Sequence, residues 1–162
     1  MLTSRFGPAV TPTSVIEEEI RTLPTIIEQP WDILRGDKFD VTDKQNRKRQ
    51  TRKQQKVRIC SFGPRCATFS RIREIPAPNG RGGRQVRSAE EPEGLAGLTW
   101  EEWKKIEPDT IMAQQTIEDC HQAYAEGRGV LLEHPWNSYM WELPRAKELL
   151  ALPGVVDVEL HV

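Results

Sequence analysis

The sequence predicts a mixed α/β fold built on a mostly parallel sheet, and three observations lead to this prediction. Short runs rich in apolar or β-branched residues, at 57–60, 129–132 and 155–160, have the length of strands. Segments with helical spacing lie between them, at 99–126 and 143–152. Strands that alternate with helices pair in parallel. With 162 residues the chain has the size of one domain, which we take to cover 1–162.

Two short elements are expected near the N-terminus. Ser14 and Glu17 have the spacing of a capping box and predict a helix over 14–22, which Pro24 would end. Residues 25–27 follow as a short strand, and 31–37 read as a turn or a single helical turn.

Residues 44–56 are the most basic stretch of the chain. They favour a helix, with Thr42 or Asp43 as N-cap, but they offer no apolar stripe that could pack on a sheet. Between Lys44 and Arg87 the chain has 14 of its 23 basic residues and a single acid, Glu74. Such a helix either stands in solvent as a basic arm or contacts a polyanion. The candidate contacts are Arg47, Lys48, Arg49, Arg52 and Lys53.

Residues 71–98 form the longest irregular segment, rich in Gly, Pro and Arg. Loops of this length in compact domains are usually functional lids or disordered segments. Its arginines are further candidates for nucleic-acid contact: Arg71, Arg73, Arg81, Arg84 and Arg87.

The C-terminal half supplies the clearest helix signals. Thr99 and Glu102 form a capping box, Pro108 marks a break or fresh start, and Gly127 supplies the stop. Helical spacing between them predicts a buried stripe of Ala113, Ile117, Cys120 and Tyr124. Trp100 and Trp103 read as core or interface residues. A helix over 143–152, with Pro144 in its first turn, precedes an edge strand at 155–160.

Cysteine and histidine usage argues against disulfides and metal sites. The three cysteines show no CxxC spacing, and the three histidines are scattered, so we expect a reducing, intracellular compartment, nuclear or cytoplasmic, and no metal. Cys60 and Cys120 read as buried structural residues. No stretch approaches the roughly 20 apolar residues of a membrane span.

Two polar motifs follow predicted strands at the point where each ends. The loop Gly63-Pro64-Arg65-Cys66 comes after 57–60, and Glu133-His134-Pro135 comes after 129–132. In open α/β sheets, ligands bind in the crevice beyond the carboxyl ends of the strands. The sequence therefore predicts that Cys66 and Glu133 face one another there.

Together with Asp40-Val41-Thr42-Asp43 and Glu90-Glu91-Pro92-Glu93-Gly94-Leu95, these motifs make the chain resemble the DNA cytosine-5 methyltransferases, in the divergent form found in mobile-element polyproteins. The resemblance covers residues 32–162. It implies an incomplete Rossmann-like methyltransferase sheet and DNA as partner. The alternative is a non-catalytic nucleic-acid-binding or retroelement polyprotein-derived module.

The resemblance also implies a chemistry for the two motif residues. Cys66 would add to C6 of a flipped-out cytosine as a thiolate, which must first form because a free thiol has a pKa of about 8.5. Arg65 and Arg71 would favour that anion. Glu133 would bind the ring nitrogen N3, and S-adenosylmethionine would supply the methyl group. The cofactor turn of the family is not recognisable, since residues 4–9 contain one glycine, and so no cofactor-binding residues are assigned.

Overall fold

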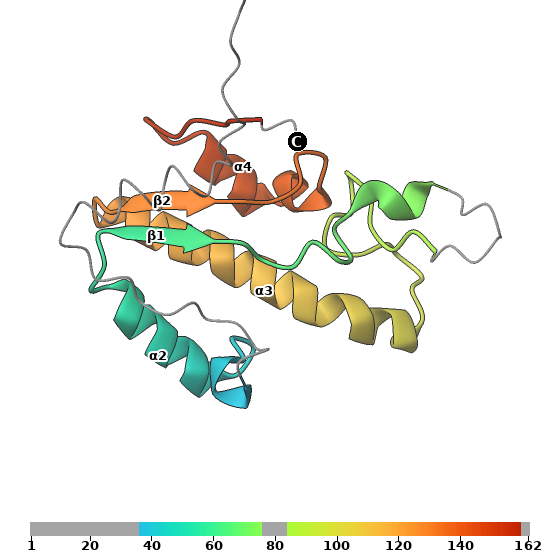
Figure 1. Cartoon of the computed structure of the whole chain (residues 1–162). Helices are drawn as coiled ribbons and strands as arrows, with labels where there is room; N and C mark the ends of the chain where they lie inside the picture. The colour runs from blue at the N-terminus through green and yellow to red at the C-terminus, as the bar shows by residue number, and fades with distance from the viewer. Residues whose placement is uncertain (1–35, 76–83, 160–162) are drawn as a thin grey trace, which may run out of the picture. The chain divides into compact units, whose positions relative to one another are not determined.

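The computed structural model describes residues 36–75 and 84–159, all within one compact unit, Trp31–Val162 (Figure 1). The predicted helix at 14–22, the strand at 25–27, the segment 4–9 and Arg81 lie outside the described residues.

A two-stranded parallel sheet joins residues that are about 70 positions apart along the chain. Strand β1 (Ile59–Phe62) pairs with β2 (Gly129–Leu132), so that Ile59 lies opposite Gly129 and Phe62 opposite Leu132. The predicted parallel pairing and mixed α/β class are thus confirmed. β2 has its predicted bounds, whereas β1 begins and ends two residues later than expected.

The predicted edge strand at 155–160 is wrong for its described part. Residues 155–159 form neither strand nor helix, and the side chains of Val156 and Val158 are 77% and 67% exposed. These two residues share one face of an extended chain. Because that face is not covered, pairing would gain little from burial.

Helix α3 (Trp100–Ala125) connects the two strands and begins at the predicted capping box of Thr99 and Glu102. The expected break at Pro108 is wrong, since the helix runs through it. Pro108 is exposed, so the carbonyl of Lys104, which loses its helical N–H donor, lies on the solvent side and can be hydrated.

The core forms where α3 meets the sheet and helix α4 (Pro144–Leu150). One buried cluster joins Ala113 and Ile117 of α3 to residues that follow the strands, and a second joins Cys60, Phe62, Cys120 and Leu149. The buried stripe of α3 is thus largely as predicted, although Ala123 replaces Tyr124, which is 37% exposed. Burial of Cys60 and Cys120 is confirmed. A core position for Trp100 is wrong, because its side chain is 70% exposed.

Helix α2 (Lys44–Gln54) has the predicted polar character, and none of its residues is buried. Asp43 is the N-cap and accepts hydrogen bonds from the backbone N–H groups of Gln45 and Asn46, both at 2.9 Å. Polar contacts at its two ends tie α2 to the rest of the unit. Asn46 donates to the carbonyl of Asp37 at 2.8 Å, and the Arg128 guanidinium donates to the carbonyl of Gln54 at 2.9 Å.

Residues 84–98 contain no helix or strand, as expected, yet they are packed against α3. Val86 and Arg87 are buried, and the backbone N–H of Leu95 donates to the carbonyl of Val86 at 3.0 Å. No helix in the described residues is long and apolar enough to cross a membrane.

Candidate functional site

The two motif residues follow neighbouring strands at one edge of the sheet. The backbone N–H of Glu133 donates to the carbonyl of Phe62 at 2.9 Å, so Glu133 directly continues the pairing of β1 with β2. Cys66 lies four residues beyond Phe62, and its side chain is exposed, as is that of Glu133. The structure therefore brings the two loops to the same edge.

Cys66 begins a tight turn. Its carbonyl accepts hydrogen bonds from the N–H groups of Phe69 and Ser70, both at 2.9 Å. The two arginines expected to favour a thiolate are both close to carboxylates. The Arg65 Nε lies 3.8 Å from an oxygen of Asp109, and an Arg71 nitrogen lies 3.4 Å from one of Glu142.

A buried polar cluster fixes the segment just after Cys66. Thr68 donates hydrogen bonds to one carboxylate oxygen of Asp109, from its backbone N–H at 3.1 Å and from its hydroxyl at 2.7 Å. The same hydroxyl accepts from Arg87 at 2.9 Å. Thr68 thus connects two oppositely charged and buried side chains, Asp109 in α3 and Arg87 in the segment before it.

Arg87 is fully buried, and its guanidinium is satisfied within the protein. Besides Thr68 it donates to the carbonyls of Pro92 at 2.6 Å and Ile106 at 3.1 Å, and to the hydroxyl of Thr110 at 2.9 Å. Its carbon centre lies 3.7 Å from the ring centroid of Phe69. Burial lowers the pKa of Arg87 to about 10, which still leaves it a cation at neutral pH. It is thus a structural residue rather than a surface contact.

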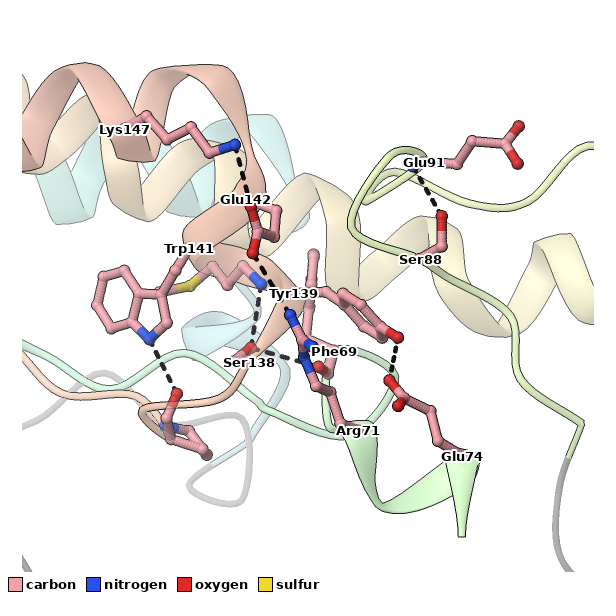
Figure 2. Close-up of polar contacts among 12 residues, drawn as sticks. Phe69, Arg71, Glu74, Ser88, Glu91, Ser138, Tyr139, Trp141, Glu142 and Lys147 are labelled. Atoms are coloured by element: carbon pink, nitrogen blue, oxygen red, sulfur yellow. Dashed lines mark hydrogen bonds and ion pairs between the residues drawn. The ribbon is translucent and has the colours of Figure 1, made fainter. Parts of the chain in front are cut away.

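A second set of contacts ties the segment after β1 to the segment after β2 (Figure 2). The N–H of Tyr139 donates to the carbonyl of Phe69 at 3.0 Å, and the Tyr139 hydroxyl donates to the carboxylate of Glu74. Arg71 lies over the Tyr139 ring, 4.7 Å from its centroid, while it pairs with Glu142. We call this set the strand-end latch.

His134 belongs to the same region. Its half-buried ring packs edge-on against Phe69, with ring centroids 6.3 Å apart, and against Trp141 at 6.0 Å. Burial lowers the pKa of His134, and neither ring nitrogen has a hydrogen-bond partner among the described residues. The imidazole therefore packs beside the loop that presents Cys66. The neighbouring aromatic residue Trp136, in contrast, is 73% exposed.

The described arginines of the 71–98 segment mostly make internal contacts. Arg71 and Arg87 are engaged as described, and Arg84 pairs with Glu102 at 3.4 Å while its side chain stays 56% exposed. The side chain of Arg73 and all of Arg81 lie outside the described structure.

Four of the basic residues of α2 line a surface groove, unlike the internally paired arginines of the 71–98 segment. A groove of about 350 Å³ lies along this helix, and Gln115 of α3 also lines it. Its other lining residues belong to α2 or, in the case of Gln55, directly follow that helix: Lys44, Arg47, Lys48, Thr51, Arg52 and Gln55. Near it, Asp119 of α3 accepts a hydrogen bond from Gln115 at 2.8 Å. Burial raises the pKa of Asp119, and the charges of Arg47 and Arg128 partly offset this.

No metal centre is formed by the residues at 36–75 and 84–159, which contain no group of three or more His, Cys, Asp or Glu side chains placed to hold an ion. No family model, curated protein or solved structure matches the chain.

Proposed function

We propose that this chain is a nucleic-acid-binding module and that α2 is its contact element. The observation that supports this best is the composition of α2, which places six cations and no acid in eleven residues, none of them buried. A helix that is polar all round gains nothing from packing. It does, however, present a dense positive charge to a phosphate backbone.

The surroundings of α2 leave this charge largely uncompensated. Among the described residues, no carboxylate lies within ion-pair distance of Lys48, Arg49 or Arg52. Several basic residues elsewhere behave differently, since Arg71, Arg128 and Arg145 all pair with glutamates. Lys48, Arg49 and Arg52 are thus available to an external anion.

Binding to duplex DNA tests the proposal. We expect the full chain to bind at low salt, with DNA affinity falling at least about tenfold when five cations of α2 are changed to glutamine. The five are Arg47, Lys48, Arg49, Arg52 and Lys53. Glutamine preserves helix propensity, and circular dichroism checks that the fold persists. Failure of the wild-type chain to bind, or equal binding by the variant, contradicts the proposal.

A second candidate, a domain similar to a DNA cytosine-5 methyltransferase with a Rossmann-like sheet, rests on a different observation. Neighbouring parallel strands lead into the Cys66 loop and into Glu133, and the strand-end latch holds the two following segments together. This arrangement agrees with a thiol and a carboxylate acting at one sheet edge. Replacing Cys66 with serine would then abolish methyl transfer and leave DNA binding intact.

The described residues do not fit S-adenosylmethionine. Neither described strand leads through a glycine-rich turn into a helix, since β1 continues into the Cys66 loop and β2 into the short turn at Tyr139–Glu142. The groove along α2 is lined by neither Cys66 nor Glu133. Equilibrium binding of S-adenosylmethionine to the full chain decides the second candidate, which fails if none is measured.

A further inference from the structure

The residues of α2 that line the groove follow a regular pattern. Lys44, Arg47, Lys48, Thr51 and Arg52 recur at positions i, i+3, i+4, i+7 and i+8, which share one face of a helix, and Gln55 at i+11 continues it. In an ordinary amphipathic helix this spacing marks the apolar face that packs on a neighbour. Here the same positions hold four cations and two uncharged polar residues, so the face is suited to an anion rather than to a core.

The side chains that line the groove differ in exposure. Arg47 and Thr51 are half-buried, while Lys48 and Arg52 are exposed and can reach a ligand. From Lys44 to Arg52 the helix rises about 12 Å, because each residue adds about 1.5 Å. That length matches the rise of three to four nucleotides along one strand, at about 3.4 Å each.

The lining contains no group suited to reading bases. Proteins that bind single strands through their bases use aromatic platforms, and duplex readers place side chains at base edges. The groove is lined by cations, one threonine and two glutamines, and no aromatic side chain takes part. The Thr51 hydroxyl is occupied in donating to the carbonyl of Arg47 at 3.1 Å.

We infer that this groove-facing side of α2 is the site that holds a phosphodiester backbone, and that it recognises the phosphates without the bases. The inference rests on the proposed function and narrows it to one face of the helix. Arg47 contributes less than its neighbours because it also faces the charge of Asp119. Lys48 and Arg52 supply most of the attraction, whereas Arg49 and Lys53, which do not line the groove, supply little.

Two matched double variants of the full chain test the inference. Lys48→Gln with Arg52→Gln changes the groove face, and Arg49→Gln with Lys53→Gln removes the same charge at the same spacing elsewhere on the helix. Fluorescence anisotropy measures the Kd of each for a labelled strand at fixed salt. We expect the groove variant to weaken binding at least about tenfold, and the control variant less than about threefold.

Competition with unlabelled probes tests the indifference to bases. Single strands of dA and dT, a duplex of equal length and inorganic polyphosphate are all expected to displace the label, with the two homopolymers within about threefold of each other. Failure of polyphosphate to compete overturns the inference, as does a greater loss in the control variant than in the groove variant. Absence of any binding by the wild-type chain would instead overturn the proposed function itself.

Discussion

At the scale of single residues, Arg87 shows how burial changes the role of a cation. Its position in a basic, irregular segment made it a candidate for DNA contact, whereas its side chain lies inside and links Thr68 with the backbone of Pro92 and Ile106. Nothing in the local sequence marks this, because Arg84 and Arg87 occupy similar polar surroundings in the chain. The hydrogen-bond partners of Arg87 lie 19 to 23 residues away along the chain, apart from Pro92, which is 5 residues away.

Replacing Arg87 with methionine is expected to lower the free energy of unfolding by about 3–5 kcal/mol, because it removes a buried cation that faces Asp109 and leaves its acceptors on Thr68, Pro92 and Ile106 without their donor. Urea denaturation measures the change. Arg84→Met is the matched control, since that side chain is 56% exposed, and it should change stability by no more than about 0.5 kcal/mol. Equal effects of the two substitutions would contradict the structural role of Arg87.

The three thiols should differ sharply in reactivity. Burial raises the pKa of Cys120 to about 12 and also raises the pKa of Cys60, whereas Cys66 is exposed. A thiol reagent at pH 8 should therefore react quickly with one thiol in the native protein and with all three in denaturant. Cys66→Ser should remove the fast phase. A fast phase that survives this substitution would show that another cysteine is accessible.

At the scale of elements, α3 and α4 are joined across their surfaces by Arg145. Its guanidinium donates to Glu118 at 2.7 Å and also pairs with Glu148. The hydrogen bond from Arg145 lowers the pKa of Glu118. A carboxyl group whose pKa is lowered in the folded state contributes stability at pH values above its ordinary pKa of about 4.3. This contribution is lost as the pH falls through the lower pKa of the folded state.

Arg145→Ala should consequently cost more stability at pH 7 than at pH 3. Because both side chains are about half exposed, the cost at pH 7 should stay below about 1 kcal/mol. Urea unfolding at the two pH values measures the difference. A cost that is independent of pH, or larger in acid, would contradict the assignment to Glu118.

The strand-end latch makes a second prediction at this scale. Tyr139 is a buried residue whose hydroxyl donates to a carboxylate, so Tyr139→Phe should lower the free energy of unfolding by about 1.5–3 kcal/mol. Tyr124→Phe is its control. That hydroxyl donates to the carbonyl of Pro153 from a side chain that is 37% exposed, and its loss should cost about 1 kcal/mol or less. The reverse order would show that the latch does not stabilise the fold.

Elements with strong local signals were predictable from the sequence. The capping box at Thr99 set the start of α3, Asp43 was one of two expected N-caps for α2, and the apolar run at Gly129–Leu132 defined β2. The break expected at Pro108 was wrong because a proline on the exposed side of a helix leaves a carbonyl that water can reach, and the sequence does not show which side of α3 is exposed. The strand predicted at 155–160 was wrong for its described part because a strand needs a neighbouring strand to pair with, and the composition of a segment does not reveal whether one is present.

At the scale of the whole molecule, the sheet has one covered and one open face in the described structure. Cys60 and Phe62 pack with Cys120 of α3, whereas Ile59 and Leu131 are 71% and 55% exposed on the other side. Parallel sheets usually have both faces covered. The parallel order was predictable from the strand–helix–strand pattern, but the extent of the sheet was not, because it depends on pairing between distant segments.

The candidate sites also differ in how far the sequence alone could reveal them. The cationic face of α2 was visible in the sequence because one helix contains it, although its groove with Gln115 was not. The placement of Cys66 and Glu133 at one edge followed from parallel pairing. The buried cluster of Thr68, Asp109 and Arg87 was invisible, since its members are brought together only by tertiary packing.

The salt dependence of DNA binding tests the central claim, contact through the cations of α2, most directly. Each phosphate neutralised on a duplex steepens the slope of log Kobs against log salt by about 0.9. We predict that replacing the five cations of α2 by glutamine makes the wild-type slope shallower by about 2 to 3, because Lys48 and Arg52 supply most of the contact and Arg47 a smaller part. An unchanged slope in the substituted chain would show that the phosphates are bound elsewhere and would contradict the account.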